Sequence, residues 1–347
     1  MKIIDAHTHI RNAGDGAPYL YDLLKVNGVD MVNVLSLQAW GEINQNAATA
    51  LVKLLHPDIT YTFGGLDYVT GRDFREQAEL LYTLGYDGIK MIEGKPTTRK
   101  KLNIPLDDAS YDPYYSFLEE NQFPVLMHIA DPPTFWDISE IPAWAKEMGW
   151  FYDDSFIPFK QYYCEMENVL SKHPKLPLIL AHFYFLSHDI QQAQKILDDH
   201  PCVRFDITAG IEMYENFSAD PATWREFFIK NSDRILYGTD STDDPPEKGN
   251  DEISISAHGK MEIDFLRTDS DILHFGMIIR GLGLPDEVQS KILNTNFTDL
   301  VGDIPKVMDV PALIKEAEYL KDFMDKDKAK VQDNIINQLK IIKQEIK

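Results

Sequence analysis

The sequence has little cysteine, no long apolar run and a shortage of basic residues. Only two cysteines, Cys164 and Cys202, occur among 347 residues, so a disulfide framework is not indicated and a reducing, cytoplasmic setting is expected. No apolar run approaches the roughly 18 residues of a membrane-spanning helix, and the first residues do not have the pattern of a signal peptide. Basic residues number 34 against 56 acidic ones, giving a formal net charge of −22. This charge argues against nucleic acids and anionic membranes as partners.

What the sequence does contain is a regular alternation of short apolar runs with longer amphipathic ones. Hydrophobic residues make up 44% of the chain, enough for a sizeable core. The alternation predicts strand–helix units around a parallel sheet. Eight units favour an α/β fold closed as a (β/α)8 TIM barrel over an open doubly wound sheet. The predicted strands are residues 2–7, 29–35, 59–66, 86–92, 124–128, 176–182, 203–207 and 234–240.

Domain boundaries and helix ends follow from the same alternation. Residues 1–302 are expected to form the barrel, and residues 303–347 a charged helical tail that packs on the barrel or on a partner subunit. Gly85 is placed as a left-handed C-cap and Ser187 as the N-cap of the helix after the sixth strand.

Two segments are longer than the barrel units require. Residues 131–156 are rich in tryptophan, phenylalanine and tyrosine, and residues 241–259 are polar and acidic. Both follow the carboxyl end of a strand, where barrel enzymes build their active sites. The aromatic insertion is therefore expected to form either a lid or pocket wall, or a subunit interface.

Polar side chains end several of the predicted strands. His7 and His9 are two residues apart on a strand, so both imidazoles point to one face, and neutral imidazole is a common metal ligand. Such a pair alone is more often coincidental. In a closed barrel, however, Lys90, His128, His182 and Asp240 would lie at the same edge. The whole set favours a metal site over isolated core histidines.

These residues resemble those of the amidohydrolase superfamily of metal-dependent barrels. The match lies in Asp5-Ala6-His7-Thr8-His9, His128, His182 and Tyr237-Gly238-Thr239-Asp240. Local sequences are similar to the amidohydrolase-related branch, which contains aminocarboxymuconate-semialdehyde decarboxylase and metal-dependent lactonases. They are Gly88-Ile89-Lys90, residues 124–128 and 178–182, and Ile292-Leu293-Asn294 before Asn296. The resemblance covers about residues 1–302.

The resemblance implies one divalent metal ion, most often Zn²⁺, with Mn²⁺ or a second ion as alternatives. Its ligands would be His7, His9, His128 and Asp240. Asp240 would also act as the proton acceptor and donor, while His182 would polarise the substrate or orient the nucleophile. Lys90 is expected to remain uncarbamylated and to balance charge or bind a substrate carboxylate, a bridging carbamate being the alternative. Three further residues near strand ends, Asp67, Glu93 and Asp206, are either partners of the site residues or ordinary loop residues.

The leading functional hypothesis is a hydrolase. Metal-bound hydroxide would attack a C–O or C–N bond of a small carbonyl compound such as a lactone or cyclic amide. The alternative is non-oxidative decarboxylation of a small carboxylic acid, and a second alternative is a barrel that binds metal and ligand without turnover. The expected partner is a small-molecule substrate, and a homo-oligomer is left open.

Overall fold

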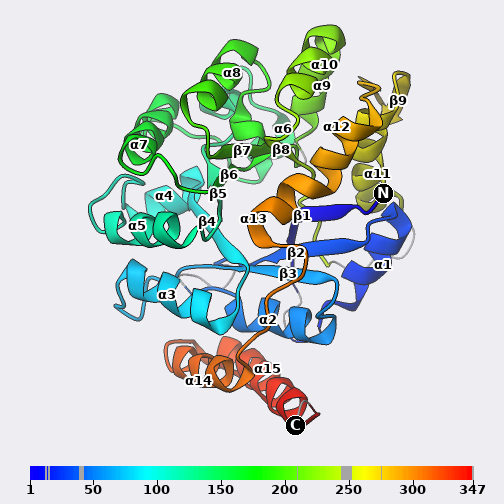
Figure 1. Ribbon diagram of the computed structural model, residues 1–347. Helices are drawn as coiled ribbons and strands as arrows, with labels where there is room; N and C mark the ends of the chain where they lie inside the picture. The colour runs from blue at the N-terminus through cyan, green and yellow to red at the C-terminus, as the bar shows by residue number, and fades with distance from the viewer. Residues whose placement is uncertain are drawn as a thin grey trace.

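Eight parallel strands form one sheet in the computed structural model of the chain (Figure 1). The structure describes all residues except 12–13, 15, 39–42, 209, 244–251, 275 and 346–347. Each strand pairs in parallel with the next one along the chain. The strands are β1 Ile4–His9, β2 Met31–Leu35, β3 Thr60–Gly64, β4 Gly88–Gly94, β5 Val125–Ile129, β6 Leu178–Leu180, β7 Val203–Asp206 and β8 Ile235–Leu236.

The sheet closes on itself where the chain leaves β8 and runs beside β1. The backbone N–H of Asp240 donates to the carbonyl of His7 at 2.8 Å, and the N–H of His9 donates to the carbonyl of Ser241 at 2.8 Å. These bonds join the last unit to the first. The (β/α)8 TIM barrel predicted from the sequence is therefore confirmed, and its carboxyl-end face is where the predicted site residues should meet.

Helices follow the strands around the outside of the barrel (Figure 1). The predicted cap at Gly85 is confirmed, because Gly85 has φ 91° and its N–H donates to carbonyls of the last turn. The helices between strands are α1 Pro18–Asn27, α2 Asn46–Leu55, α3 Phe74–Leu84, α4 Pro96–Leu102, α5 Asp112–Asn121, α7 Phe159–Lys172, α8 Ile190–Asp199, α9 Ile211–Ala219 and α10 Pro221–Lys230. After β8 come α11 Glu252–Arg267, the hairpin β9 Asp271–His274 and β10 Met277–Arg280, α12 Asp286–Ser290, a π-helical turn Lys291–Thr295, and α13 Asn296–Val301.

One predicted helix cap is wrong. The helix after β6 begins at Ile190, and its N-cap is Asp189, whose carboxylate accepts a hydrogen bond from the N–H of Gln192 at 2.9 Å. Ser187 lies two residues too early, because the chain first makes a tight turn over residues 182–185. That turn shortens the helix and, as described below, carries a site residue.

The inside of the barrel is filled by apolar side chains. This interior cluster is separate from the larger one between sheet and outer helices. Its members are Ile4, Ala6, Met31, Leu35, Tyr61, Phe63, Leu126, Ile179, Ala181 and Leu236, completed by Phe297 and Val301 of α13. A packed interior of this kind is typical of TIM barrels and leaves the strand ends as the place for a site.

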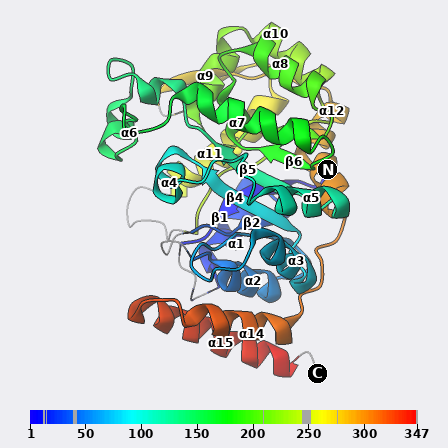
Figure 2. The same cartoon turned by 90° about the vertical axis from the view of Figure 1, so that its left-hand side faces the viewer.

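The C-terminal tail forms two helices, α14 Val310–Lys321 and α15 Lys326–Glu345. They pack on each other and on α2 and α3, at one side of the barrel (Figures 1 and 2). Among the described residues, no helix combines the length and the apolar character needed to cross a membrane.

The two long insertions differ in how much of them the structure describes. The aromatic insertion contains a short 3₁₀ turn, Pro133–Trp136, and α6 Ala143–Glu147, which stands away from the barrel in Figure 2. Much of the predicted acidic insertion, residues 244–251, lies outside the described residues.

Candidate metal centre

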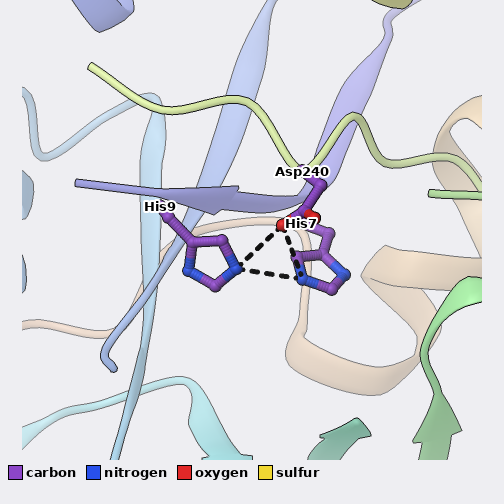
Figure 3. A group of neighbouring side chains, drawn as sticks. All are labelled: His7, His9 and Asp240. Atoms are coloured by element: carbon purple, nitrogen blue, oxygen red, sulfur yellow. Dashed lines mark hydrogen bonds and ion pairs between the residues drawn. The ribbon is translucent and has the colours of Figure 1, made fainter. Parts of the chain in front are cut away.

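Three of the predicted ligands, His7, His9 and Asp240, meet at the carboxyl end of the barrel (Figure 3). Their ligand atoms all lie within 4.8 Å of one another. The two Nε2 atoms are 3.2 Å apart. Oδ1 of Asp240 lies 3.0 Å from Nε2 of His9 and 3.5 Å from Nε2 of His7. The two histidines lie on β1 and Asp240 lies in the chain after β8, and these two segments close the barrel.

A β-bulge in β1 directs the first histidine inward. Asp5 pairs with Val32 and Thr8 pairs with Val34, so β1 has one more residue than β2 between these two pairs. An extra residue of this kind re-aims the following side chains. As a result Ala6 lies in the interior cluster and the next residue, His7, also points into the barrel, toward His9.

The loop after β8 is fitted closely against β1. A side chain at Gly238 would place a Cβ 2.8 Å from Cβ of His7, so only glycine allows this approach. Oδ2 of Asp5 accepts a hydrogen bond from the hydroxyl of Thr239 at 2.6 Å. Burial raises the pKa of Asp5 to about 7. These contacts fix the backbone that carries Asp240, which itself adopts a left-handed φ of 53°.

The rear nitrogens of both histidines of β1 face acceptors. Nδ1 of His7 lies 2.9 Å from Oδ2 of Asp206, and Nδ1 of His9 lies 3.3 Å from the carbonyl of Leu35. Burial opposes ionisation of Asp206, but His7 and its hydrogen bond lower the pKa of Asp206 to about 2. Carboxylates and carbonyls can only accept, so both Nδ1 atoms carry the proton and the Nε2 lone pairs of a neutral pair point into the site.

This arrangement fits a bound cation. Two lone pairs and a carboxylate oxygen converge, and a metal ion placed between them would satisfy all three. Ligand bonds of about 2.0–2.1 Å in a tetrahedral zinc site separate neighbouring ligand atoms by roughly 3.3 Å. The observed separations of 3.0, 3.2 and 3.5 Å lie around that value. A carboxylate behind a ligating imidazole, as Asp206 lies behind His7, is also typical of metal sites.

The remaining two histidines form a second pair next to the first. Nδ1 of His128 lies 3.1 Å from Nε2 of His182, and the rings of His7 and His182 have their centroids 5.4 Å apart. The other nitrogens again face acceptors: Nε2 of His128 lies 3.0 Å from Asp131, and Nδ1 of His182 lies 3.4 Å from the carbonyl of Thr208. The inward lone pairs therefore face each other. Among the described residues, His128 is thus grouped with His182 rather than with the three ligands above, and its part in binding metal stays a prediction.

Burial keeps three of these imidazoles neutral. Desolvation and nearby positive charge lower the pKa of His7 to about 3, and desolvation is the main reason that the pKa values of His128 and His182 fall to about 4. Metal ligation requires the neutral form of imidazole. These three side chains are therefore ready to bind a cation at neutral pH.

Lys90 reaches the same place from β4. Its Nζ lies 3.2 Å from Nε2 of His7, and its side chain is buried. Burial lowers the pKa of Lys90 to about 8, although the charges of Asp240 and Asp206 oppose the shift. The amine is therefore mostly charged at neutral pH and lies beside the first pair of histidines.

The turn that carries His182 is strained. The four consecutive residues 182–185 all have φ between 53° and 55°, and none is glycine. A left-handed turn of L-residues costs about 1–2 kcal/mol per residue, so surrounding contacts must compensate. The N–H of His182 donates to Oδ1 of Asp206 at 2.7 Å, and the hydroxyl of Tyr163 donates to the carbonyl of Tyr184 at 2.8 Å. Strain of this kind is often found at functional sites.

The three residues left open by the sequence have different roles. Asp206 contacts both His7 and the backbone of His182. Glu93 is buried at the end of β4, where Oε1 accepts hydrogen bonds from Gln38 and Tyr68, both at 2.8 Å. Asp67 instead accepts hydrogen bonds from backbone N–H groups of its own loop and shapes that loop.

Sequence reasoning missed several residues around the second pair. Asp131 binds His128, and its own partners are Lys95 and Tyr152. Thr208 places its hydroxyl 3.2 Å from Nδ1 of His7. The one available signal was the position of Asp131, three residues after a predicted ligand. The other three residues were not recognisable, because their contacts join distant segments.

Comparison with known proteins was made for sequence and for structure. The family model described as amidohydrolase matches residues 4–302, whereas no curated protein matches the chain. Among solved structures, a TIM-barrel protein of Bordetella bronchiseptica has a TM-score of 0.57 at 15% identity, covering 86% of this chain and 98% of its own. A 2,6-dihydroxybenzoate decarboxylase of Rhizobium has a TM-score of 0.53 at 14% identity, covering 87% and 98%. A 4-oxalomesaconate hydratase of Rhodopseudomonas palustris has a TM-score of 0.51 at 14% identity, covering 92% and 99%.

These structural likenesses are low in identity and show the fold alone. The family match spans the whole barrel and includes every residue of both histidine pairs. We conclude that this chain belongs to the amidohydrolase family, as its first-strand motif and its strand-end residues had indicated.

Proposed function

We propose that this protein is a metal-dependent hydrolase that cleaves a C–O or C–N bond of a small carbonyl compound, such as a lactone or a cyclic amide. The observation that carries the proposal is the position of Asp240. Its carboxylate lies against both β1 histidines, yet its side chain is 36% exposed, whereas those of His7 and His9 are only 1% and 9% exposed. Asp240 is thus the member of the centre that a water and a substrate can reach.

The residues present suit such a reaction. His7, His9 and Asp240 would hold a divalent cation, with His128 as a further ligand on the strength of the family resemblance. When bound, the cation would supply a Lewis acid and lower the pKa of a water molecule toward neutrality. Zn²⁺ is the ion we expect, with Mn²⁺ or a second ion as alternatives.

Asp240 would act as the general base. Burial alone would raise the pKa of Asp240, but the neighbouring histidines hold it well below its ordinary range, so the carboxylate is charged at neutral pH. It would accept a proton from the attacking water and then donate it to the leaving oxygen or nitrogen. His182 would polarise the substrate or orient the nucleophile.

The charges at the mouth favour a substrate that carries a negative group. Asp131, Asp206 and Asp240 are opposed by the ammonium groups of Lys90 and Lys95, which leaves one negative charge. A divalent cation reverses the sign of this local charge, although the whole chain has a net charge of −22. The expected partner is accordingly a small anionic or carbonyl-bearing molecule.

The test is a substrate panel with a metal-loaded enzyme. Protein loaded with Zn²⁺ or Mn²⁺ is incubated with lactones and cyclic amides, with and without a carboxylate. Ring opening is followed by proton release for the lactones and by the appearance of a free amine for the cyclic amides. We expect turnover that falls about 10²- to 10⁴-fold in Asp240→Asn. The absence of ring opening across the panel, with metal bound, contradicts the proposal.

Decarboxylation is the second candidate, and Lys90 favours it. A charged amine beside His7 suits a substrate carboxylate held next to the cation. The Rhizobium protein of similar fold is a 2,6-dihydroxybenzoate decarboxylase, so 2,6-dihydroxybenzoate is the first probe. If the protein releases carbon dioxide and does not open lactone rings, its reaction is decarboxylation and not hydrolysis. A metal-loaded protein inert in both assays would instead favour a binding protein.

A further inference from the structure

The aromatic insertion between β5 and α7 has a small core of its own. Tyr152, 1% exposed, packs with Phe135 and Ala145 in this core, and its ring centroid lies 4.6 Å from that of Trp136. The N–H of Tyr152 also donates to the carbonyl of Phe135 at 2.9 Å. The position of Tyr152 is therefore set by the packing of the insertion.

The hydroxyl of Tyr152 leaves this core and donates a hydrogen bond to Oδ2 of Asp131. Asp131 is only 4% exposed and has two other partners. Nζ of Lys95 lies 3.1 and 3.2 Å from its two oxygens, and Nε2 of His128 lies 3.0 Å from Oδ1. The ion pair with Lys95 and the hydrogen bond from Tyr152 are contacts of an ionised carboxylate.

The insertion reaches Asp131 by a second route. Nζ of Lys95 lies 4.4 Å from the ring centroid of Trp150, over its face. A cation over an aromatic face is attracted to it. Trp150 therefore holds Lys95 in the position from which it binds Asp131.

The ionised carboxylate determines the state of His128. Because a carboxylate only accepts, Nε2 of His128 carries the proton and Nδ1 is left with its lone pair. That lone pair points toward Nε2 of His182, 3.1 Å away. A carboxylate behind an imidazole fixes both the tautomer and the ring direction of a metal ligand.

We propose that Asp131 is a positioning residue that transmits the packing of the aromatic insertion to His128, so that the centre binds metal tightly only when the insertion is folded against the barrel. The proposal rests on the metal-dependent function proposed above, since it takes His128 as a ligand. It makes the insertion a support of the metal centre, whichever substrate the protein takes.

The first test needs no metal and no substrate. In the metal-free protein, nitrogen-15 NMR of the histidine rings should show His128 wholly in the Nε2–H form. Tyr152→Phe removes one hydroxyl and keeps the ring, and we expect it to mix the two tautomers of His128. Asp131→Asn should mix them further. An unchanged tautomer in both variants overturns the proposal.

The second test measures metal affinity. Competition between the protein and a chelator for Co²⁺ should show a 10- to 100-fold loss of affinity in Asp131→Asn and a smaller loss in Tyr152→Phe. Trp150→Leu, which removes the aromatic face beside Lys95 but keeps Tyr152 and His128, the other two partners of Asp131, should also weaken binding. Wild-type affinity in all three variants overturns the proposal.

The matched control is Tyr21→Phe, which removes a buried hydroxyl that lies 2.9 Å from the hydroxyl of Thr60 at the start of β3 and leaves Asp131 untouched. It should leave the tautomer of His128 unchanged. The result of these two tests is distinct from the result of the substrate panel that tests the proposed function. A protein inert on every substrate can still show the tautomer and Co²⁺ effects, and an active hydrolase can lack them.

Discussion

The carboxylate of Asp206, at the end of β7, accepts a hydrogen bond from Nδ1 of His7, on β1, at 2.9 Å. Both side chains are buried, and Oδ1 of the same carboxylate accepts the backbone N–H of His182. Asp206 thus connects the two histidine pairs without belonging to either. It fixes the tautomer of one ligand and the backbone that carries another site residue.

Asp206→Asn should therefore weaken metal binding while the barrel stays folded. The amide retains an acceptor but loses the charge that holds the proton on Nδ1 of His7, and such changes typically cost 10- to 100-fold in metal affinity. Isothermal titration with Zn²⁺ measures the effect. Asp67→Asn, at another buried aspartate that follows a strand, is the control and should bind as wild type. Equal affinities in the two variants would show that Asp206 is not a partner of the ligand.

Lys90 should carry no carbamate. A carbamate would place a further negative charge beside Asp240 and Asp206, whose charges instead favour the ammonium form of Lys90. Protein equilibrated with carbon-13 bicarbonate is therefore expected to give no carbamate signal in its NMR spectrum. A signal that is present in the wild type and disappears in Lys90→Arg would contradict this expectation and favour two bridged ions.

The buried ion pair between Lys53 and Asp87 should matter for stability rather than for activity. Nζ of Lys53 lies 2.6 Å from Oδ2 of Asp87, with both side chains at most 2% exposed. Lys53→Met leaves a buried carboxylate without its partner and should lower the free energy of unfolding by about 3–5 kcal/mol, measured in urea.

Two further variants test whether the unpaired charge of Asp87 causes this loss of stability. Adding Asp87→Asn to Lys53→Met removes the unpaired charge and should recover much of the loss. Lys25→Met, at an exposed lysine 3.6 Å from Asp22, should change stability by less than about 1 kcal/mol. A small effect of Lys53→Met, similar to that of Lys25→Met, would mean that the buried pair contributes little.

The sequence was sufficient to predict the barrel and the strands that carry the site. The alternation of apolar runs gave eight units, and the two-residue spacing of His7 and His9 placed them on one face. The strand-end positions of Lys90, His128 and Asp240 could be predicted because parallel strands of a barrel end on a common face. These features depend on local periodicity, which a single sequence contains.

What could not be predicted depends on contacts between distant segments. The bulge of β1 is set by its pairing with β2, and the left-handed turn over residues 182–185 is stabilised by Asp206 and Tyr163. Neither feature has a glycine or another local signal. The approach of His182 to His128 involves this turn, whereas the four-ligand set of His7, His9, His128 and Asp240 remains a prediction.

Glu93 should make the stability of the protein depend on pH. It is 2% exposed, and burial, opposed by the hydrogen bond from Tyr68, raises its pKa from 4.5 to about 7. Because the folded state binds the proton more tightly than the unfolded state, this group contributes stability that is fully present below about pH 4.5 and is lost as the pH rises through 7.

Glu93→Gln removes this dependence because glutamine does not titrate. The difference in free energy of unfolding, wild type minus Glu93→Gln, should fall by about 1–3 kcal/mol between pH 5 and pH 8.5, measured by urea unfolding at each pH. Asp5, whose pKa is also raised to about 7, is present in both proteins and cancels in the difference. Glu287→Gln, at an exposed position of α12, should give a flat difference. A flat difference for Glu93→Gln as well would mean that Glu93 is ionised in the folded protein throughout this range, and that the buried end of β4 accommodates a charge.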